Sequence, residues 1–123
     1  MATTNLSIEQ VSGAKVFQDT DLGATAVAVK ASSGSIYAIE IDNTANAAEA
    51  EYVKLWDTAQ GSVTVGTTAP TMIIPIAAAA KKTVVIPGGL AFGTAITVAC
   101  VTTAGTAGTT NPTADLICRV VYA

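Results

Sequence analysis

Hydrophobic and polar residues alternate along most of this chain, in short segments bounded by Gly, Pro, Asn or Ser. In the segment 35–42, Tyr37, Ile39 and Ile41 occupy one set of alternate positions, and small or acidic residues occupy the other set. Successive side chains of a strand point to opposite faces, so this pattern predicts a strand with one buried face. Further strands are expected at 24–30, 51–57, 71–76, 83–86, 94–102 and 115–122.

These segments are rich in β-branched residues, which fit a pleated sheet, and none has the spacing of an amphipathic helix. The sequence therefore predicts an all-β fold, an antiparallel β-sandwich or a jelly-roll-like domain. Residues 77–82 favour a turn or a single helical turn, because they are too few to form a stable helix alone. Alternation is weak near the N-terminus, so we expect an extended N-terminal arm over residues 1–23 and a single sandwich domain over residues 24–123. Longer connections are expected at 43–50, 59–69 and 104–114.

Charged residues make up only 12% of the 123 residues, whereas a typical domain has about 25%. Apolar residues make up 50%, and small residues such as Ala, Thr, Ser and Gly must fill much of the surface in place of charges. A surface of this kind does little to keep copies of the chain apart. We therefore expect a subunit of an assembly, and a homo-oligomer.

The distribution of charge and hydropathy argues against two other classes of partner. The net charge is −3 and the six basic residues are scattered, so nucleic acid is not an expected partner. The longest apolar run, 72–80, is interrupted by Pro75 and is shorter than the roughly 20 residues that cross a bilayer. No membrane association is expected.

Histidine is absent from the sequence, which removes Ser-His-Asp and Cys-His catalysis and imidazole ligands for zinc. We therefore expect no enzymatic activity, no cofactor and no metal. Asn43, Asn46, Glu49 and Glu51 could form an oxygen-rich site, although a loop with polar side chains on its outside is the favoured interpretation.

The two cysteines, Cys100 and Cys118, fall in the last two expected strands and could face each other across a hairpin. Buried reduced thiols are favoured over a disulfide, because nothing in the sequence indicates an oxidising compartment. A reactive thiol is not expected, because no base is placed beside either residue.

Tyr52, Lys54 and Trp56 are the candidate interface residues. They alternate with Val53 and Leu55 within one expected strand, so they share a face. Three roles remain open for the two aromatic residues: part of the core, an anchor of a protein contact, or a platform on which a glycan stacks.

Several short strings in the chain resemble small β-sandwich virion proteins of tailed bacteriophages. The resemblance covers roughly 32–123, and it is a pattern of strands and turns with no catalytic motif. The strings are Gly34–Tyr37, Ile41–Asn43, Tyr52–Trp56, Gly66–Pro70, Pro87–Phe92, Ile96–Ala99 and Val120–Tyr122.

This resemblance implies a non-enzymatic structural protein of the virion, such as a capsid decoration or cement protein on the outer surface of the head. The expected partner is then the major capsid protein or another virion protein, and a trimer is favoured among the oligomers. The expected location is the capsid surface, after assembly in the host cytoplasm. The alternative is a glycan- or host-binding module of a phage tail or cell surface, which would use Tyr52 and Trp56.

Overall fold

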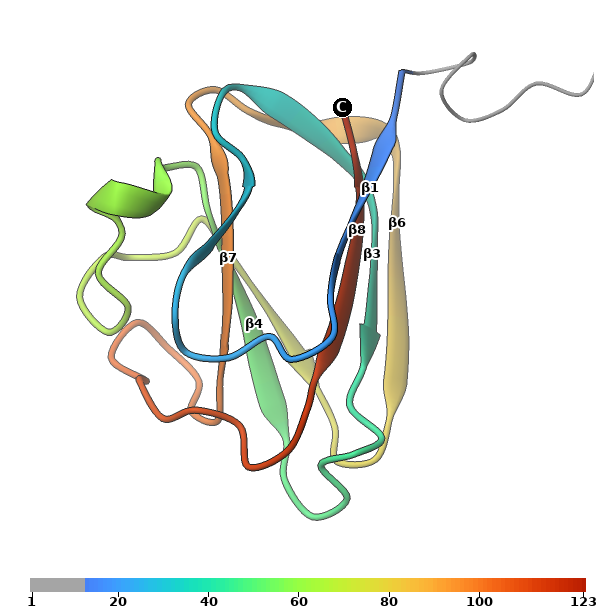
Figure 1. Cartoon of the computed structure of the whole chain (residues 1–123), viewed down its shortest axis with the longest axis vertical. Coiled ribbons are helices and arrows are strands. Elements are labelled where there is room, and N and C mark those ends of the chain that lie inside the picture. Colours follow the sequence, from blue (N-terminus) through green and yellow to red (C-terminus); the bar gives the residue numbers. More distant parts are fainter. Residues whose placement is uncertain (1–12) are drawn as a thin grey trace, which may run out of the picture.

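The computed structural model describes residues 13–123, which form two four-stranded sheets packed face to face (Figure 1). Within this part of the chain, the only helical element is a single turn of 3-10 helix, η1 (Gln60–Ser62). The strands are β1 (Lys15–Asp19), β2 (Val27–Lys30), β3 (Gly34–Asp42), β4 (Glu51–Trp56), β5 (Met72–Ile76), β6 (Lys81–Phe92), β7 (Ile96–Val101) and β8 (Ile117–Tyr122).

The strand order is β1-β8-β3-β6 in one sheet, called sheet A below, and β2-β7-β4-β5 in the other, called sheet B. Every neighbouring pair is antiparallel. The chain crosses between the sheets at almost every connection, and this order is that of a jelly roll. The predicted all-β antiparallel sandwich is confirmed, and each of the seven expected strands is present.

The core lies between the sheets and is built from the inward-facing positions of each strand. It includes Ile39 and Ile41 of β3, Val53 and Leu55 of β4, and Val98 of β7, all 0% exposed. Each sheet therefore buries its apolar face against the other, which is the main favourable contribution to folding of such a domain.

The expected N-terminal arm over residues 1–23 needs correction, because part of it is a strand of the sandwich. β1 pairs with β8 along its whole length, from Lys15 opposite Tyr122 to Asp19 opposite Cys118. Leu22 is 1% exposed and belongs to the core. The sandwich therefore begins before residue 24, and residues 1–12 of the expected arm lie outside the described part.

The expected faces of β3 also need correction at one position. A bulge between Ile36 and Ala38 shifts the alternation, so the buried residues are Ile36, Ile39 and Ile41. Tyr37 lies outside the core cluster, close to Gly89 of β6. A bulge places two residues of one strand opposite one residue of its partner, which explains why alternation fails here.

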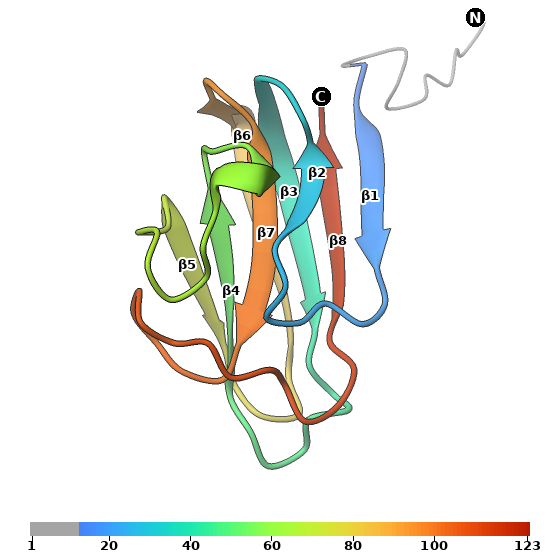
Figure 2. The ribbon, with the colours of Figure 1, turned by 60° about the vertical axis from the view of Figure 1, so that its left-hand side comes forward.

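The connections make the two sides of the sandwich different. The β4–β5 connection, with η1, and the β7–β8 connection both run over the outside of sheet B, whereas no connection between the described strands runs over the outside of sheet A (Figures 1 and 2). Of the segment 77–82, predicted as a turn or a single helical turn, residues 77–80 form a tight turn, with Ala79 at a φ of 57°, whereas Lys81 and Lys82 begin β6. In the described residues, no helix is long and apolar enough to cross a membrane.

Candidate functional site

Tyr52, Lys54 and Trp56 lie on the outward-facing side of β4, as their alternation with Val53 and Leu55 predicts. The structure nevertheless leaves Lys54 0% exposed and Trp56 1% exposed, because the two long connections cover this face. Tyr52, at the other end of the strand, is half-buried. Of the candidate interface residues, Lys54 and Trp56 are therefore covered by the chain's own connections, and for Trp56 this agrees with burial, one of the three roles left open.

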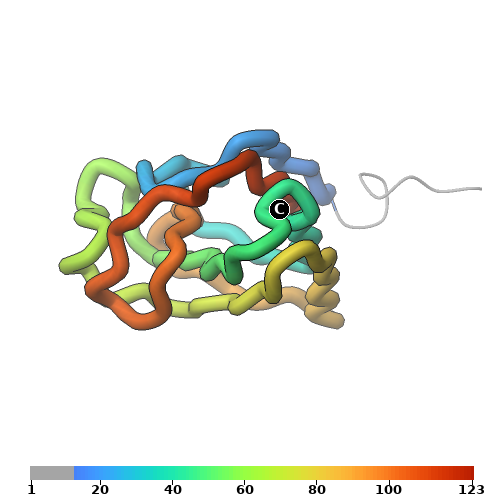
Figure 3. The backbone as a smooth tube through the Cα atoms, turned by 90° about the horizontal axis from the view of Figure 1, so that it is seen from below, coloured from blue at the N-terminus to red at the C-terminus, as the bar shows by residue number. Residues whose placement is uncertain are grey.

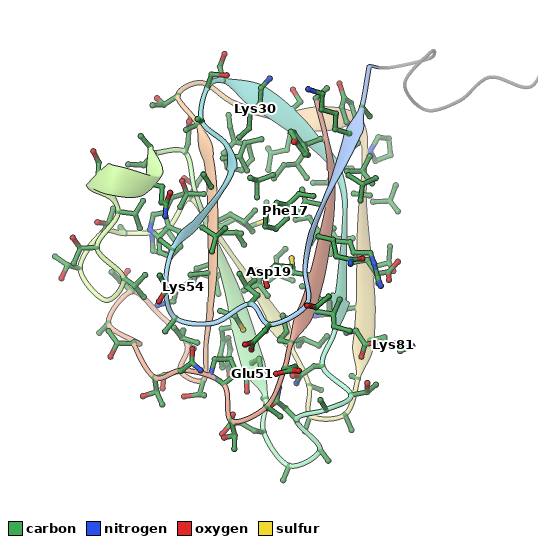
Figure 4. The ribbon with its side chains drawn as sticks, viewed as in Figure 1. Phe17, Asp19, Lys30, Glu51, Lys54 and Lys81 are labelled. Carbon is green, nitrogen blue, oxygen red and sulfur yellow. The ribbon has the colours of Figure 1, made fainter. Side chains whose placement is uncertain are left out.

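Lys54 is held beneath the β7–β8 connection, toward which its side chain points in Figure 4. Its Nζ donates hydrogen bonds to the backbone carbonyls of Thr106, at 3.1 Å, and Gly108, at 3.0 Å. Burial lowers the pKa of the Lys54 ammonium from its ordinary value, because a charged group loses its hydration there. The two hydrogen bonds of Lys54 hold the β7–β8 connection against sheet B, which explains why a lysine is buried at this position.

Trp56 is fastened in a similar way to the β4–β5 connection. Its indole Nε1 donates a hydrogen bond to the carbonyl of Thr68 at 2.9 Å. The next residue, Asp57, accepts hydrogen bonds from the backbone N–H groups of Gly93 and Thr94 at 2.8 and 2.7 Å, and these bonds lower its pKa. A glycan cannot stack on Trp56 while these connections are in place, so β4 does not present the aromatic platform that the glycan alternative needs.

Among residues 13–123, the open surface lies instead on the outer face of sheet A. Four apolar residues there are in register across all four strands, and we call them the apolar row: Val16, Val121, Ala38 and Val85. Val16 is 61% exposed and Val85 is 66% exposed, and they are the exposed large hydrophobic residues of the described chain. An exposed apolar strip of this kind marks a candidate contact surface for another protein.

A polar row borders the apolar row on one side. Arg119 of β8 lies between Gln18 and Glu40 in the register, and it bonds to both at 2.7 Å through Nε and Nη1. The next pair of β3 and β6 on this face is Asp42 and Lys81, whose charged atoms are 3.5 Å apart. An uncharged strip beside paired charges resembles the centre and rim of a protein interface.

Sequence reasoning missed the apolar row because its members come from four strands. The alternation of 35–42 correctly placed Ala38 on the outer face, and the expected strand 83–86 contained Val85. The missing information was the pairing of β1 with β8, which places Val16 beside Val121.

The polar residues of the β3–β4 connection lie at one end of the sandwich, where they fasten neighbouring connections. Asn43 is 0% exposed, and its amide donates to the carbonyls of Glu49 and Ala77. Asn46 is 3% exposed; its Oδ1 accepts from the Ala114 N–H at 2.7 Å, and its amide donates to the Ala114 carbonyl at 3.1 Å. The favoured interpretation of an outward polar loop is therefore wrong for both asparagines, which are structural.

Glu49 and Glu51 lie at the same end of the sandwich, and their carboxyl groups are close enough to interact. Glu51 is 0% exposed, whereas Glu49 is half-buried and accepts a hydrogen bond from the Thr113 N–H at 3.1 Å. A pocket of about 320 Å³ lies beside them, lined by residues 45–49 with Thr113 and Ala114. In the described residues, no group of three or more His, Cys, Asp or Glu side chains could hold a metal ion.

Cys100 and Cys118 are free and buried, which confirms the preference for reduced thiols. They do not lie on a hairpin, because β7 belongs to sheet B and β8 to sheet A. Burial raises the pKa of both thiols, that of Cys118 to about 12. Both therefore remain thiols at neutral pH and behave as small apolar groups of the core.

Comparison with protein-family models finds no family that matches the chain, and no curated protein and no solved structure gives a significant match.

Proposed function

We propose that this chain is a non-enzymatic structural protein of a tailed-phage particle, which decorates or cements the outer surface of the head as an oligomer. The observation that carries this proposal is the difference between the two sides of the jelly roll. One sheet is covered by the chain's own connections, and the other offers the apolar row to a partner.

The chemistry of sheet A suits a protein partner. Four strands spaced about 4.8 Å apart make a sheet face of the order of 15–20 Å across. The apolar row crosses this face without a charge, and Arg119 and Glu40 beside it are already paired within the chain. A partner can therefore bury the row without leaving a charge unpaired, which would be costly.

The low charge of the whole chain supports the same proposal. With 12% charged residues, the surface has few groups that must stay hydrated when copies or capsid subunits pack together. We infer a closed oligomer, with the trimer favoured, and the major capsid protein or another virion protein as the partner.

Immuno-electron microscopy tests the proposal. The sample is purified particles of a phage whose genome encodes this chain. Antibodies raised against the purified protein should label the heads at many sites per particle. Labelling confined to the tail tip would favour the host-binding alternative. Labelling of no particle would refute the virion assignment.

A further inference from the structure

Glu51 carries a buried polar atom that is not satisfied. Within residues 13–123, its Oε1 is the buried side-chain nitrogen or oxygen atom that has no hydrogen-bond partner. Such atoms are rare in folded proteins because their hydration is lost without replacement. The position of Glu51 therefore requires an explanation.

The surroundings of Glu51 contain no compensating positive charge among the described residues. Glu51 occupies the inward-facing set of β4, at the end of the core, where it is labelled in Figure 4. Its Oε2 lies 4.0 Å from Sγ of Cys100 on β7, and its partner on β5 is Ile76. The Cys118 thiol on β8 belongs to the same core cluster as Cys100, and Asp19 of β1 is opposite Cys118 in the register.

The charged group that acts on Glu51 is the carboxylate of Glu49, two residues earlier in the chain, which has the same sign. Two adjacent carboxyl groups in such a place do not both ionise, so they hold one proton between them. Burial, together with the hydrogen bond and the charge of Glu49, raises the pKa of Glu51 to about 8. The hydrogen bonds from Glu51 and from the Thr113 N–H lower the pKa of Glu49. An ionised Glu51 has no donor for its Oε1, but a protonated Glu51 can donate to the Glu49 carboxylate. At neutral pH, Glu51 is therefore the neutral donor and Glu49 the charged acceptor.

Glu49 connects this pair to a distant part of the chain. Besides the N–H bond, the Thr113 hydroxyl lies 3.2 and 3.1 Å from the two carboxyl oxygens of Glu49. Figure 3, seen from this end of the sandwich, shows the β3–β4 connection in green beside the β7–β8 connection in orange-red. The contact joins two segments 64 residues apart in sequence.

We propose that the Glu49–Glu51 pair is a pH-sensitive latch, in which one shared proton holds the Thr113 end of the β7–β8 connection in place. In mildly alkaline solution the proton of Glu51 passes to the solvent. Two negative charges then lie side by side, and the half-buried Glu49 side chain turns toward water because Glu51 is enclosed by the core. Thr113 thereby loses its acceptor, while Ala114 remains bound to Asn46 and limits the opening.

Hydrogen exchange of the Thr113 amide tests the latch on the purified chain. Wild type and Glu51→Gln are compared at equal pH, so the ratio of their rates cancels the intrinsic effect of pH on exchange. Gln keeps the size of Glu and can donate to Glu49, but it does not ionise. We expect the ratio of wild-type to variant rate to be near one at about pH 6 and at least about tenfold at about pH 10.

Glu40→Gln is the matched control, because Glu40 is an exposed carboxylate on the outer face of sheet A. It should leave Thr113 exchange as in wild type at both pH values. A ratio that stays near one, or an equal effect of Glu40→Gln, overturns the proposal.

A titration of wild type keeps the proposal testable if Glu51→Gln does not fold. Carbon-13 NMR should show the Glu51 side-chain carboxyl titrating near pH 8, with the Thr113 amide shift changing over the same range. A Glu51 titration in the ordinary range for glutamate, or a Thr113 signal that does not change with it, overturns the latch. This test does not depend on the virion assignment.

Discussion

The ammonium group of Lys54 lies 3.0 Å from the carbonyl oxygen of Gly108, across 54 residues of sequence. This contact places a lysine where a strand of a sandwich usually meets either solvent or a partner. It also turns a flexible run of Thr, Ala and Gly residues into an ordered cover for sheet B. Several properties of the molecule follow from such contacts and can be measured.

Lys54→Met should loosen this cover. Methionine fills similar space, but it leaves the carbonyls of Thr106 and Gly108 without their donor, and one unpaired buried group costs about 1–3 kcal/mol. The free energy of unfolding in urea should fall by this amount, and amides 104–110 should exchange faster. Lys30→Met, on the short strand β2, is the control and should leave the exchange of 104–110 unchanged. An unchanged stability of Lys54→Met would contradict this account of the loop.

Trp56 is the only tryptophan, so fluorescence reports on its surroundings directly. Because it is 1% exposed, its emission should be blue-shifted in the native protein and weakly quenched by iodide. Unfolding should shift the emission to the red and restore quenching. Native emission like that of free tryptophan would mean that the face of β4 is open after all.

Val85→Lys should weaken the proposed assembly without unfolding the chain. Val85 is 66% exposed, so its replacement should change the free energy of unfolding by less than about 0.5 kcal/mol. Light scattering should give about three times the 12.3 kDa chain mass for wild type and a lower mass for the variant. Thr67→Lys, on the exposed β4–β5 connection, is the control and should assemble as wild type does. A wild-type mass that remains at that of one chain, or a variant that assembles fully, would count against sheet A as the contact between copies.

The free energy of unfolding should fall as the pH rises from about 5 to about 8. In this range Glu51 keeps its proton in the folded chain, with a pKa of about 8, but loses it in the unfolded chain. The folded state then binds more protons, so raising the pH favours unfolding. Glu49 acts in the opposite sense: its lowered pKa stabilises the fold above its ordinary value, and this contribution is lost in acid. Urea denaturation at a series of pH values should therefore show a maximum near pH 5, and Glu51→Gln should remove the decline above it.

Alanine substitutions at Gly88 and Gly89 distinguish backbone strain at a positive φ from a steric clash with Tyr37. Their φ values are 79° and 83°, so alanine strains the backbone at either position, by about 1–2 kcal/mol. At Gly89 a Cβ would also lie 2.9 Å from Cε1 of Tyr37, whereas at Gly88 nothing lies within 4 Å. Gly89→Ala should therefore lower the melting temperature more than Gly88→Ala does. Equal losses would show that Tyr37 moves aside freely.

The sequence predicted the fold well because the alternation of apolar residues is local. It placed Val53 and Leu55 in the core and the intervening side chains on the other face, and this was correct. It could not show that the outer face of β4 is covered, because the covering loops are held by contacts such as Lys54 to Gly108, which join distant segments.

Two other differences between the fold expected from the sequence and the observed fold have local physical causes. Tyr37 lies outside the core because a single-residue bulge of β3 against β8 changes the face to which its side chain points. β1 escaped prediction because it is an edge strand in which Val16 faces outward and Phe17 packs against the core, so few of its residues are buried. The Glu49–Glu51 contact was suggested by proximity in sequence, but the burial of Glu51 was not.

The register of β1 determines how the molecule responds to mechanical force. Lys15 pairs with Tyr122, so the start of β1 and the end of β8 leave the sandwich at the same corner. Pulling these two ends apart loads the hydrogen bonds between β1 and β8 one after another, from Lys15–Tyr122 toward Asp19–Cys118, as in unzipping. The sandwich should therefore yield first at this corner at low force, while the opposite end, where Asn46 and Ala114 meet, remains intact.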